Sequence, residues 1–146
     1  MENTFLDFDF YQTNSATDIA IFGENKKQMM IVIADETEQN DANIAFLEKI
    51  IAAIKYDFKQ DTIYFFLQND AKLTISELMA KHQIKDLLVF GIGNAQLGIY
   101  VHQKKYQPFY IQSVTYLFAD NLTEIQGQKE LKGALWDALK KVFLHG

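Results

Sequence analysis

Six consecutive apolar residues at positions 29–34, Met-Met-Ile-Val-Ile-Ala, constrain most strongly what this chain can fold into. A strand with one face in water alternates polar and apolar residues, whereas a strand covered on both faces is apolar throughout. We therefore expect 29–34 to be a central strand of a sheet with helices on both faces. The composition supports so large a core, because 49% of the 146 residues are hydrophobic and only one is proline.

Strand-like and helix-like segments alternate after this run. The segments 62–67 and 87–92 are apolar and strand-like, and apolar residues at helical spacing predict a helix from Asp41, as its cap, to about Tyr56. A second helix is expected to open at about Thr74. The order of these segments predicts an α/β fold made of parallel βαβ units.

Both ends of the chain add further expected elements. A polar tract with a glycine, 23–27, separates 18–22 from 28–34 and predicts a leading hairpin, with an N-terminal extension as the alternative. Towards the other end, 106–119 is expected to be extended, with 114–119 as its best strand, and 128–143 is expected to be an amphipathic helix. We divide the chain into a peptide at 1–17 and one α/β domain at 18–146.

Composition excludes several classes of function. The chain contains no cysteine, which rules out a disulfide, a thiolate zinc site and a cysteine nucleophile, and favours a reducing compartment. Its first residues lack the features of a secretion signal and no apolar stretch is long enough for a membrane span, so we expect a cytoplasmic protein. The formal net charge of −5 argues against direct binding to nucleic acid.

A glycine cluster follows the third expected strand and is the strongest candidate for a ligand cleft. Gly91, Gly93 and Asn94 would lie at the carboxyl edge of the sheet, and Asp35 would follow the first central strand at the same edge. The spacing of these glycines matches neither a dinucleotide fingerprint nor a phosphate loop, so we expect no cofactor. The three histidines lack the spacing of metal ligands, and we expect neither a metal nor a catalytic set.

The N-terminal peptide alternates large apolar residues with acids. Such a segment can dock on another protein by inserting its apolar side chains into a groove. Packing against its own domain, or onto the sheet edge of a second copy, remains an alternative. The candidate partner-binding residues are Phe5, Leu6, Phe8, Phe10 and Tyr11.

The text from Val114 to Phe143, VTYLFADNLTEIQGQKELKGALWDALKKVF, resembles the psi subunit of bacterial DNA polymerase III, in particular psi-like proteins of the Bacteroidetes type. The resemblance lies in a strand, a short polar stretch with Leu122, and a helix that carries Ala134-Leu135-Trp136. The middle strand also ends in a similar Phe90-Gly91 pair.

The resemblance implies a three-layer α/β/α sandwich like that of uracil-DNA glycosylases, with a mainly parallel four-stranded sheet of order 2-1-3-4 and no glycosylase activity. It also implies a non-catalytic accessory subunit whose N-terminal peptide binds clamp-loader subunits and whose folded body binds a chi-like subunit. The alternative is an enzyme of the glycosylase-like or nucleotide-handling class that uses Asp35 and the loop 91–98. The sequence leaves the partner and the oligomeric state open.

Overall fold

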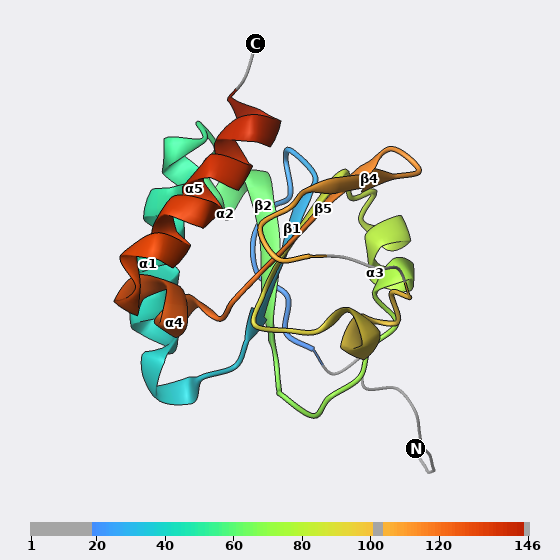
Figure 1. Ribbon diagram of the computed structural model, residues 1–146. Helices are drawn as coiled ribbons and strands as arrows, with labels where there is room; N and C mark the ends of the chain where they lie inside the picture. The colour runs from blue at the N-terminus through green and yellow to red at the C-terminus, as the bar shows by residue number, and fades with distance from the viewer. Residues whose placement is uncertain (1–18, 101–103, 145–146) are drawn as a thin grey trace.

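A computed structural model describes residues 19–100 and 104–144 (Figure 1). Its strands are β1 (Met29–Ala34), β2 (Thr62–Leu67), β3 (Asp86–Phe90), β4 (Phe109–Ile111) and β5 (Val114–Ala119). Its α-helices are α1 (Asn40–Ala53), α2 (Phe58–Asp61), α3 (Ile75–Lys81), α4 (Leu122–Gly127) and α5 (Lys129–Phe143), and the 3-10 helices are η2 (Thr37–Gln39) and η3 (Asn94–Leu97).

The strands form one mixed sheet in the order β2-β1-β3-β5-β4. Strands β2, β1, β3 and β5 are parallel to their neighbours, and β4 runs antiparallel to β5 at one edge. The prediction of an α/β fold with a mainly parallel sheet is therefore confirmed, although the sheet has five strands. The expected central strand is β1, in which every residue is buried.

The two faces of the sheet are covered unequally (Figure 1). Helices α1, α2, α4 and α5 lie on one face, and α3 and η3 lie on the other. Odd-numbered residues of β1, such as Ile31, pack into the first core with Leu47 and Leu139, whereas even-numbered ones, such as Val32, pack into the second core with Leu78. This alternation explains why β1 is apolar throughout.

The predicted leading hairpin is wrong. Phe22 forms an isolated antiparallel bridge to Tyr64 of β2, and the backbone amides of 24–27 bond to the carbonyls of 59–62, where α2 leads into the same strand. The physical reason is that β1 has β2 on one side and β3 on the other, so neither edge of β1 can accept a hairpin partner. Among the described residues, this segment is an extension along the outer edge of β2.

Several expected boundaries also shift. Helix α1 begins at Asn40 and ends at Ala53, so Asp41 lies in its first turn instead of capping it. The segment from Val114 to Phe143 contains two helices, because Asn121 accepts a hydrogen bond from the amide of Glu124 and opens α4 before α5 begins. Buried Asn43 of α1 then bonds to Thr123 and Gln126, which fixes α4 on α1.

Candidate functional site

The candidate site lies at the carboxyl edge of the sheet, where β1, β3 and β5 end. In α/β folds this edge is the usual place for ligands, because the loops that leave parallel strands meet there. The structure brings Gly91 after β3 close to Ala34 at the end of β1 and to Asn121 after β5. The ends of β1, β3 and β5 thus meet around Gly91, and the contacts at this edge determine what it can bind.

Gly91 is required by both its backbone angle and its surroundings. Its φ is +79°, and an added Cβ would lie 2.7 Å from the Asn121 Cβ and 2.9 Å from the Ala34 Cβ. A side chain at this position would force one of these neighbours to move. Gly91 thus allows the ends of three strands to pack closely, and the space that its side chain would occupy is filled by Ala34 and Asn121.

The rest of the loop closes on itself. The Asn94 side-chain amide donates a 2.8 Å hydrogen bond to the carbonyl of Ile99, which stabilises the turn around η3. Gly93, in contrast, has no heavy atom within 4 Å of where its Cβ would be, so its backbone is open to a neighbouring hollow. Of the expected cleft residues, Asn94 has a role in holding the loop and Gly93 lines free space.

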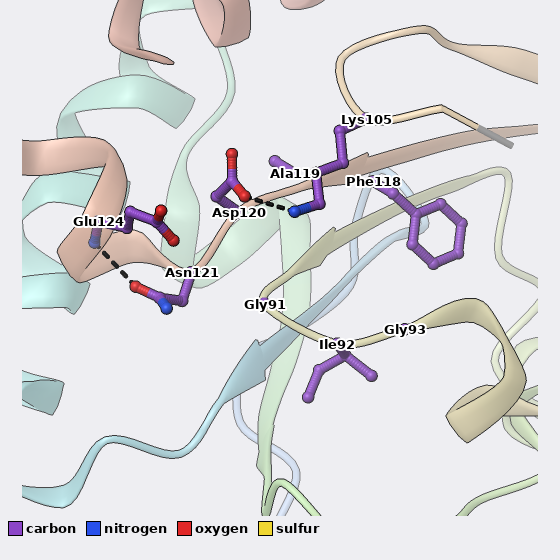
Figure 2. A pocket seen from close by; sticks show the side chains of 9 residues that line it. All are labelled: Gly91, Ile92, Gly93, Lys105, Phe118, Ala119, Asp120, Asn121 and Glu124. Atoms are coloured by element: carbon purple, nitrogen blue, oxygen red, sulfur yellow. Dashed lines mark hydrogen bonds and ion pairs between the residues drawn. The ribbon is translucent and has the colours of Figure 1, made fainter. Parts of the chain in front are cut away.

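The hollow beside Gly93 is a cleft of about 280 Å³ (Figure 2). It lies between the end of β3 and the end of β5, and its charged side chains come from Lys105, Asp120 and Glu124. Lys105 and Asp120 pair with each other, so the remaining unbalanced charge is the carboxylate of Glu124. The lining residues are Gly91, Ile92, Gly93, Lys105, Phe118, Ala119, Asp120, Asn121 and Glu124.

Asp120 is held by three contacts within the chain. Its Oδ1 accepts a hydrogen bond from Lys105 Nζ at 2.5 Å, and its Oδ2 accepts one from the Tyr106 hydroxyl at 2.7 Å. The Asp120 backbone amide donates to the same hydroxyl at 3.2 Å. Burial opposes ionisation, but the hydrogen bonds from Lys105 and Tyr106 and the charge of Lys105 outweigh it and lower the pKa of Asp120. Asp120 is therefore a stable anion that fixes the segment 105–106.

Tyr106 shows what this contact stabilises. Its backbone φ of 64° is in the left-handed region, which is unfavourable for a residue with a large side chain. Burial and the hydrogen bond to Asp120 raise the pKa of the phenol, so it remains a neutral donor. Two hydrogen bonds with Asp120, one donated and one accepted by the phenol oxygen, offset the cost of this backbone angle.

Asp35 does not line this cleft. Its Oδ1 accepts hydrogen bonds from the Asn40 side chain at 3.0 Å and from the Thr37 hydroxyl at 3.4 Å, which brace the turn into α1. The carboxyl group borders a separate hollow of about 340 Å³, together with Phe66 and Lys72. The structure thus assigns Asp35 and the glycine loop to two different hollows.

The remaining predictions concern the N-terminal peptide, a metal site and a membrane span. The five candidate partner-binding residues, Phe5 to Tyr11, lie outside the described residues. Within 19–100 and 104–144, no group of three or more histidine, cysteine or acidic side chains is placed to hold a metal ion. In the same part of the chain, no helix is both long and apolar enough to cross a bilayer.

The sequence interpretation did not place Lys105, Tyr106 and Asp120 at this cleft. A signal was present for Asp120, because it follows the strand 114–119 directly, just as Asp35 follows the strand 29–34. The same rule applied to both strand ends would have selected it. No comparable signal marks Lys105 and Tyr106, which reach Asp120 through tertiary structure.

Comparisons with known proteins do not assign the chain to a family. A scan against models of protein families gives no match, and a search of the curated proteins gives none either. Any assignment of function therefore has to rest on the residues and their geometry.

Proposed function

We propose that this chain is a non-catalytic accessory subunit of the DNA polymerase III holoenzyme, similar to psi, which acts in the cytoplasm and links other proteins at the clamp loader. The observation that carries the proposal is the state of the two carboxylates that follow β1 and β5. Asp35 braces the turn into α1 and Asp120 holds Lys105 and Tyr106. Both therefore stabilise the chain itself, at the edge where an α/β enzyme would place its working groups.

The arrangement of the sheet is compatible with the fold that the psi resemblance implies. Strands β2, β1, β3 and β5 are adjacent and parallel in this order, and helices lie on both faces. The proposed relation to uracil-DNA glycosylases takes these four strands as the common sheet. Strand β4 is then an addition at the β5 edge.

The segment that carries the resemblance has an evident structural role here. Leu135 and Leu139 of α5 are fully buried, and Leu122 of α4 joins them in the first core. Core residues of this kind support a shared fold and leave the contact with partners to other parts of the chain. In our proposal, the aromatic run 5–11 contacts the clamp loader, and the folded body receives a chi-like subunit where one exists.

A binding experiment with purified proteins tests this function. The full-length chain is immobilised and exposed to the clamp-loader complex of the same organism, and dissociation constants are measured by biolayer interferometry. Phe10→Asp should weaken binding by at least about tenfold, because it places a charge where an apolar group is buried. Gln12→Ala, in the polar spacer, is the matched control and should bind as the natural chain does.

Two results would overturn the proposal. The first is absence of binding by the natural chain at clamp-loader concentrations of on the order of 10 μM, which is a weak affinity for a subunit contact. The second is equal binding by the natural chain and by Phe10→Asp, which would separate the clamp loader from the aromatic run. Hydrolysis of a nucleotide or release of a base by the purified chain would instead favour the enzyme alternative.

A further inference from the structure

Within 19–100 and 104–144, no strand pairs with the outer side of β4, so its backbone groups are available on that side. The strand pairs with β5 through a two-residue turn, Gln112-Ser113, so that Ile111 and Val114 form the closing hydrogen-bonded pair and Tyr110 faces Thr115 in a non-bonded pair. The amide of Thr115 accordingly points the other way and donates to the carbonyl of Lys85. The N–H and C=O of Tyr110 therefore point away from β5, towards the edge of the described sheet.

A row of aromatic rings reaches this edge on the thinly covered face of the sheet. The ring of Phe109 stacks on that of Tyr116 with centroids 5.0 Å apart, and its centroid is 6.2 Å from that of Phe118. Phe109 and Tyr116 are only partly buried, and both pack against the core beneath α3. An apolar side chain on an added strand would extend this row.

The opposite face of the same edge is polar and basic. Tyr110 is 70% exposed there, and a hollow of about 260 Å³ lies between Gln107 and Pro108 on one side and Lys141 and Val142 on the other. Lys141 is exposed and lines this hollow. Lys104 is also exposed, and its carbonyl accepts a hydrogen bond from the amide of Gln107, so it lies in the turn that leads into β4. An added strand with apolar side chains on one face and carboxylates on the other would match both faces of β4.

The run 5–11 of the chain has this pattern. In an extended conformation Leu6, Phe8 and Phe10 share one face. Asp7 and Asp9 lie at the centre of the other face, with Phe5 and Tyr11 at its two ends. No lysine or arginine occurs in residues 1–18, which include four acids. Residues 1–18 thus contribute −4 to the formal net charge of −5.

A second copy of the chain can supply the run 5–11 more readily than the same chain can. Ala20 lies near Phe66, and its segment follows the outer side of β2, at the opposite edge of the sheet. A position beyond β4 is therefore six strand spacings away, or about 29 Å, and is displaced further along the strands. The nine residue steps from Ala20 to Tyr11 span at most about 32 Å when fully extended, which leaves almost no length for a path around the molecule. A second copy has no such restriction.

We propose that residues 5–11 of a second copy add to β4 as an extra strand, with Leu6, Phe8 and Phe10 continuing the row of Phe109 and Tyr116, and Asp7 and Asp9 facing Lys104 and Lys141. Two copies exchange these segments reciprocally and form a two-fold dimer. This inference does not depend on the polymerase function. It predicts that dimer formation and any other partner of 5–11 compete.

Light scattering and sedimentation equilibrium of the full-length chain test the dimer. Tyr110→Pro removes the outward N–H without a loss of bonds to β5, and Phe8→Asp places a charge in the aromatic row. Each variant should raise the dissociation constant of the dimer at least about tenfold. Tyr110→Phe keeps the backbone donor and is the matched control, with thermal unfolding as the check that each variant is folded.

A mixing experiment identifies the contact. Phe8→Asp has an intact β4 and Tyr110→Pro has an intact segment 5–11, so a mixture of the two variants restores one of the two contacts. We expect heterodimers in the mixture at concentrations where each variant alone is monomeric. Pairing of β4 with β4 predicts instead that Phe8→Asp alone dimerises as the natural chain does and that no heterodimers form, because each heterodimer would contain a Tyr110→Pro strand.

Three outcomes would overturn the inference: a natural chain that stays monomeric up to on the order of 200 μM, far above the range of a specific weak dimer; a dimer that neither variant weakens; or a mixture without heterodimers. The clamp-loader test is separate from these outcomes, because Tyr110→Pro weakens the dimer contact at β4 and keeps the run 5–11 that is proposed to bind the clamp loader. Loss of binding by Phe10→Asp in that test, together with a monomeric natural chain, would support the proposed function alone.

Discussion

The two edges of the sheet are protected in different ways. At the β2 edge, Phe22 and Tyr64 exchange two backbone hydrogen bonds of 2.9 Å. Four more, from the amides of residues 24–27, tie the same segment to Thr62, the first residue of β2, and to 59–61 of α2 just before it. At the β4 edge, the described chain supplies no such cover, and the strand is only three residues long. An exposed edge is a template for pairing with another chain.

The two edges show that one sheet can have one edge strand covered by its own chain and the other left available for pairing with another strand. Covering β2 requires Gly23 at a φ of +105°, since an added Cβ would lie 2.2 Å from the Thr62 carbonyl oxygen. Strand β4 is only three residues long, so within it only the N–H and C=O of the middle residue, Tyr110, point away from β5. We therefore expect substitutions at the covered edge to change folding stability, and substitutions at the open edge to change association.

Amide hydrogen exchange gives the largest expected contrast between the edges. The Tyr64 amide donates to the Phe22 carbonyl, whereas the Tyr110 amide points outward. In dilute solution the Tyr64 amide should exchange on the order of a thousandfold more slowly, as measured by NMR. At high concentration the Tyr110 amide should become protected if the proposed dimer forms. Equal exchange of both amides in dilute solution would remove the distinction between the edges.

Gly23→Ala should break the covered edge. The new Cβ meets a backbone oxygen and a φ that alanine rarely adopts, so we expect a loss of about 3 kcal/mol in the free energy of unfolding, measured by urea denaturation. Gly133→Ala on α5 is the matched control. It has no heavy atom within 4 Å of its Cβ position and should stabilise the protein by about 0.5–1 kcal/mol. Similar effects at both glycines would contradict the role assigned to Gly23.

Asp86→Asn tests β3, which is separated from the open β4 edge by β5. Burial raises the pKa of Asp86 to about 6, against the charge of Lys85 and the hydrogen bond from Thr115. The folded state then binds more protons than the unfolded state between about pH 4 and 6, so stability falls as the pH rises through this window and is constant above it.

The Asp86→Asn variant should lose most of this slope. At pH 7 it should be more stable than the natural chain by about 1 kcal/mol, a figure reduced to allow for solvent screening of a partly exposed group. Urea denaturation at several pH values measures the effect. Phe22 and Tyr64 lie at the other edge and should keep their protection in both proteins. A slope that persists in Asp86→Asn would assign the pH dependence to another group.

The smallest expected effect concerns the turn that presents β4. Gln112 and Ser113 have φ values of 51° and 69°, a conformation in which asparagine and glycine are favoured. The double substitution Gln112→Asn and Ser113→Gly should raise the free energy of unfolding by about 0.5 kcal/mol and leave the dimer constant unchanged. Thermal unfolding and light scattering measure both quantities. A large change in association would mean that the turn itself belongs to the contact.

The parts of the fold that were predictable are those in which local pattern and final position agree. The segments 29–34, 62–67 and 114–119 are apolar runs, and each is a strand of the observed sheet. The hairpin expected at 18–34 failed because its turn signals are local, whereas the choice of partner depended on β1 having both edges occupied. Strand β4 is too short, at three residues, to show an alternation.

The candidate site was predictable only as far as its edge. Gly91 and Gly93 lie at the carboxyl ends of the strands, as expected, but Asp35 borders a different hollow. The distance between two loops at one edge depends on the packing of the strands between them, which no sequence spacing encodes. Tyr106 was missed for the same reason, since its partner Asp120 is 14 residues away.

The unequal covering of the two faces also determines when each core can form during synthesis. The core under α3 draws nearly all of its buried residues from before Tyr100, with Phe118 as the exception. The core under α5 lacks Leu122, Leu135 and Leu139 until the last part of the chain has left the ribosome. A nascent chain therefore exposes the inner faces of Ile31 and Leu88 until α4 and α5 have been made, and α5 is the last of the described elements to cover them.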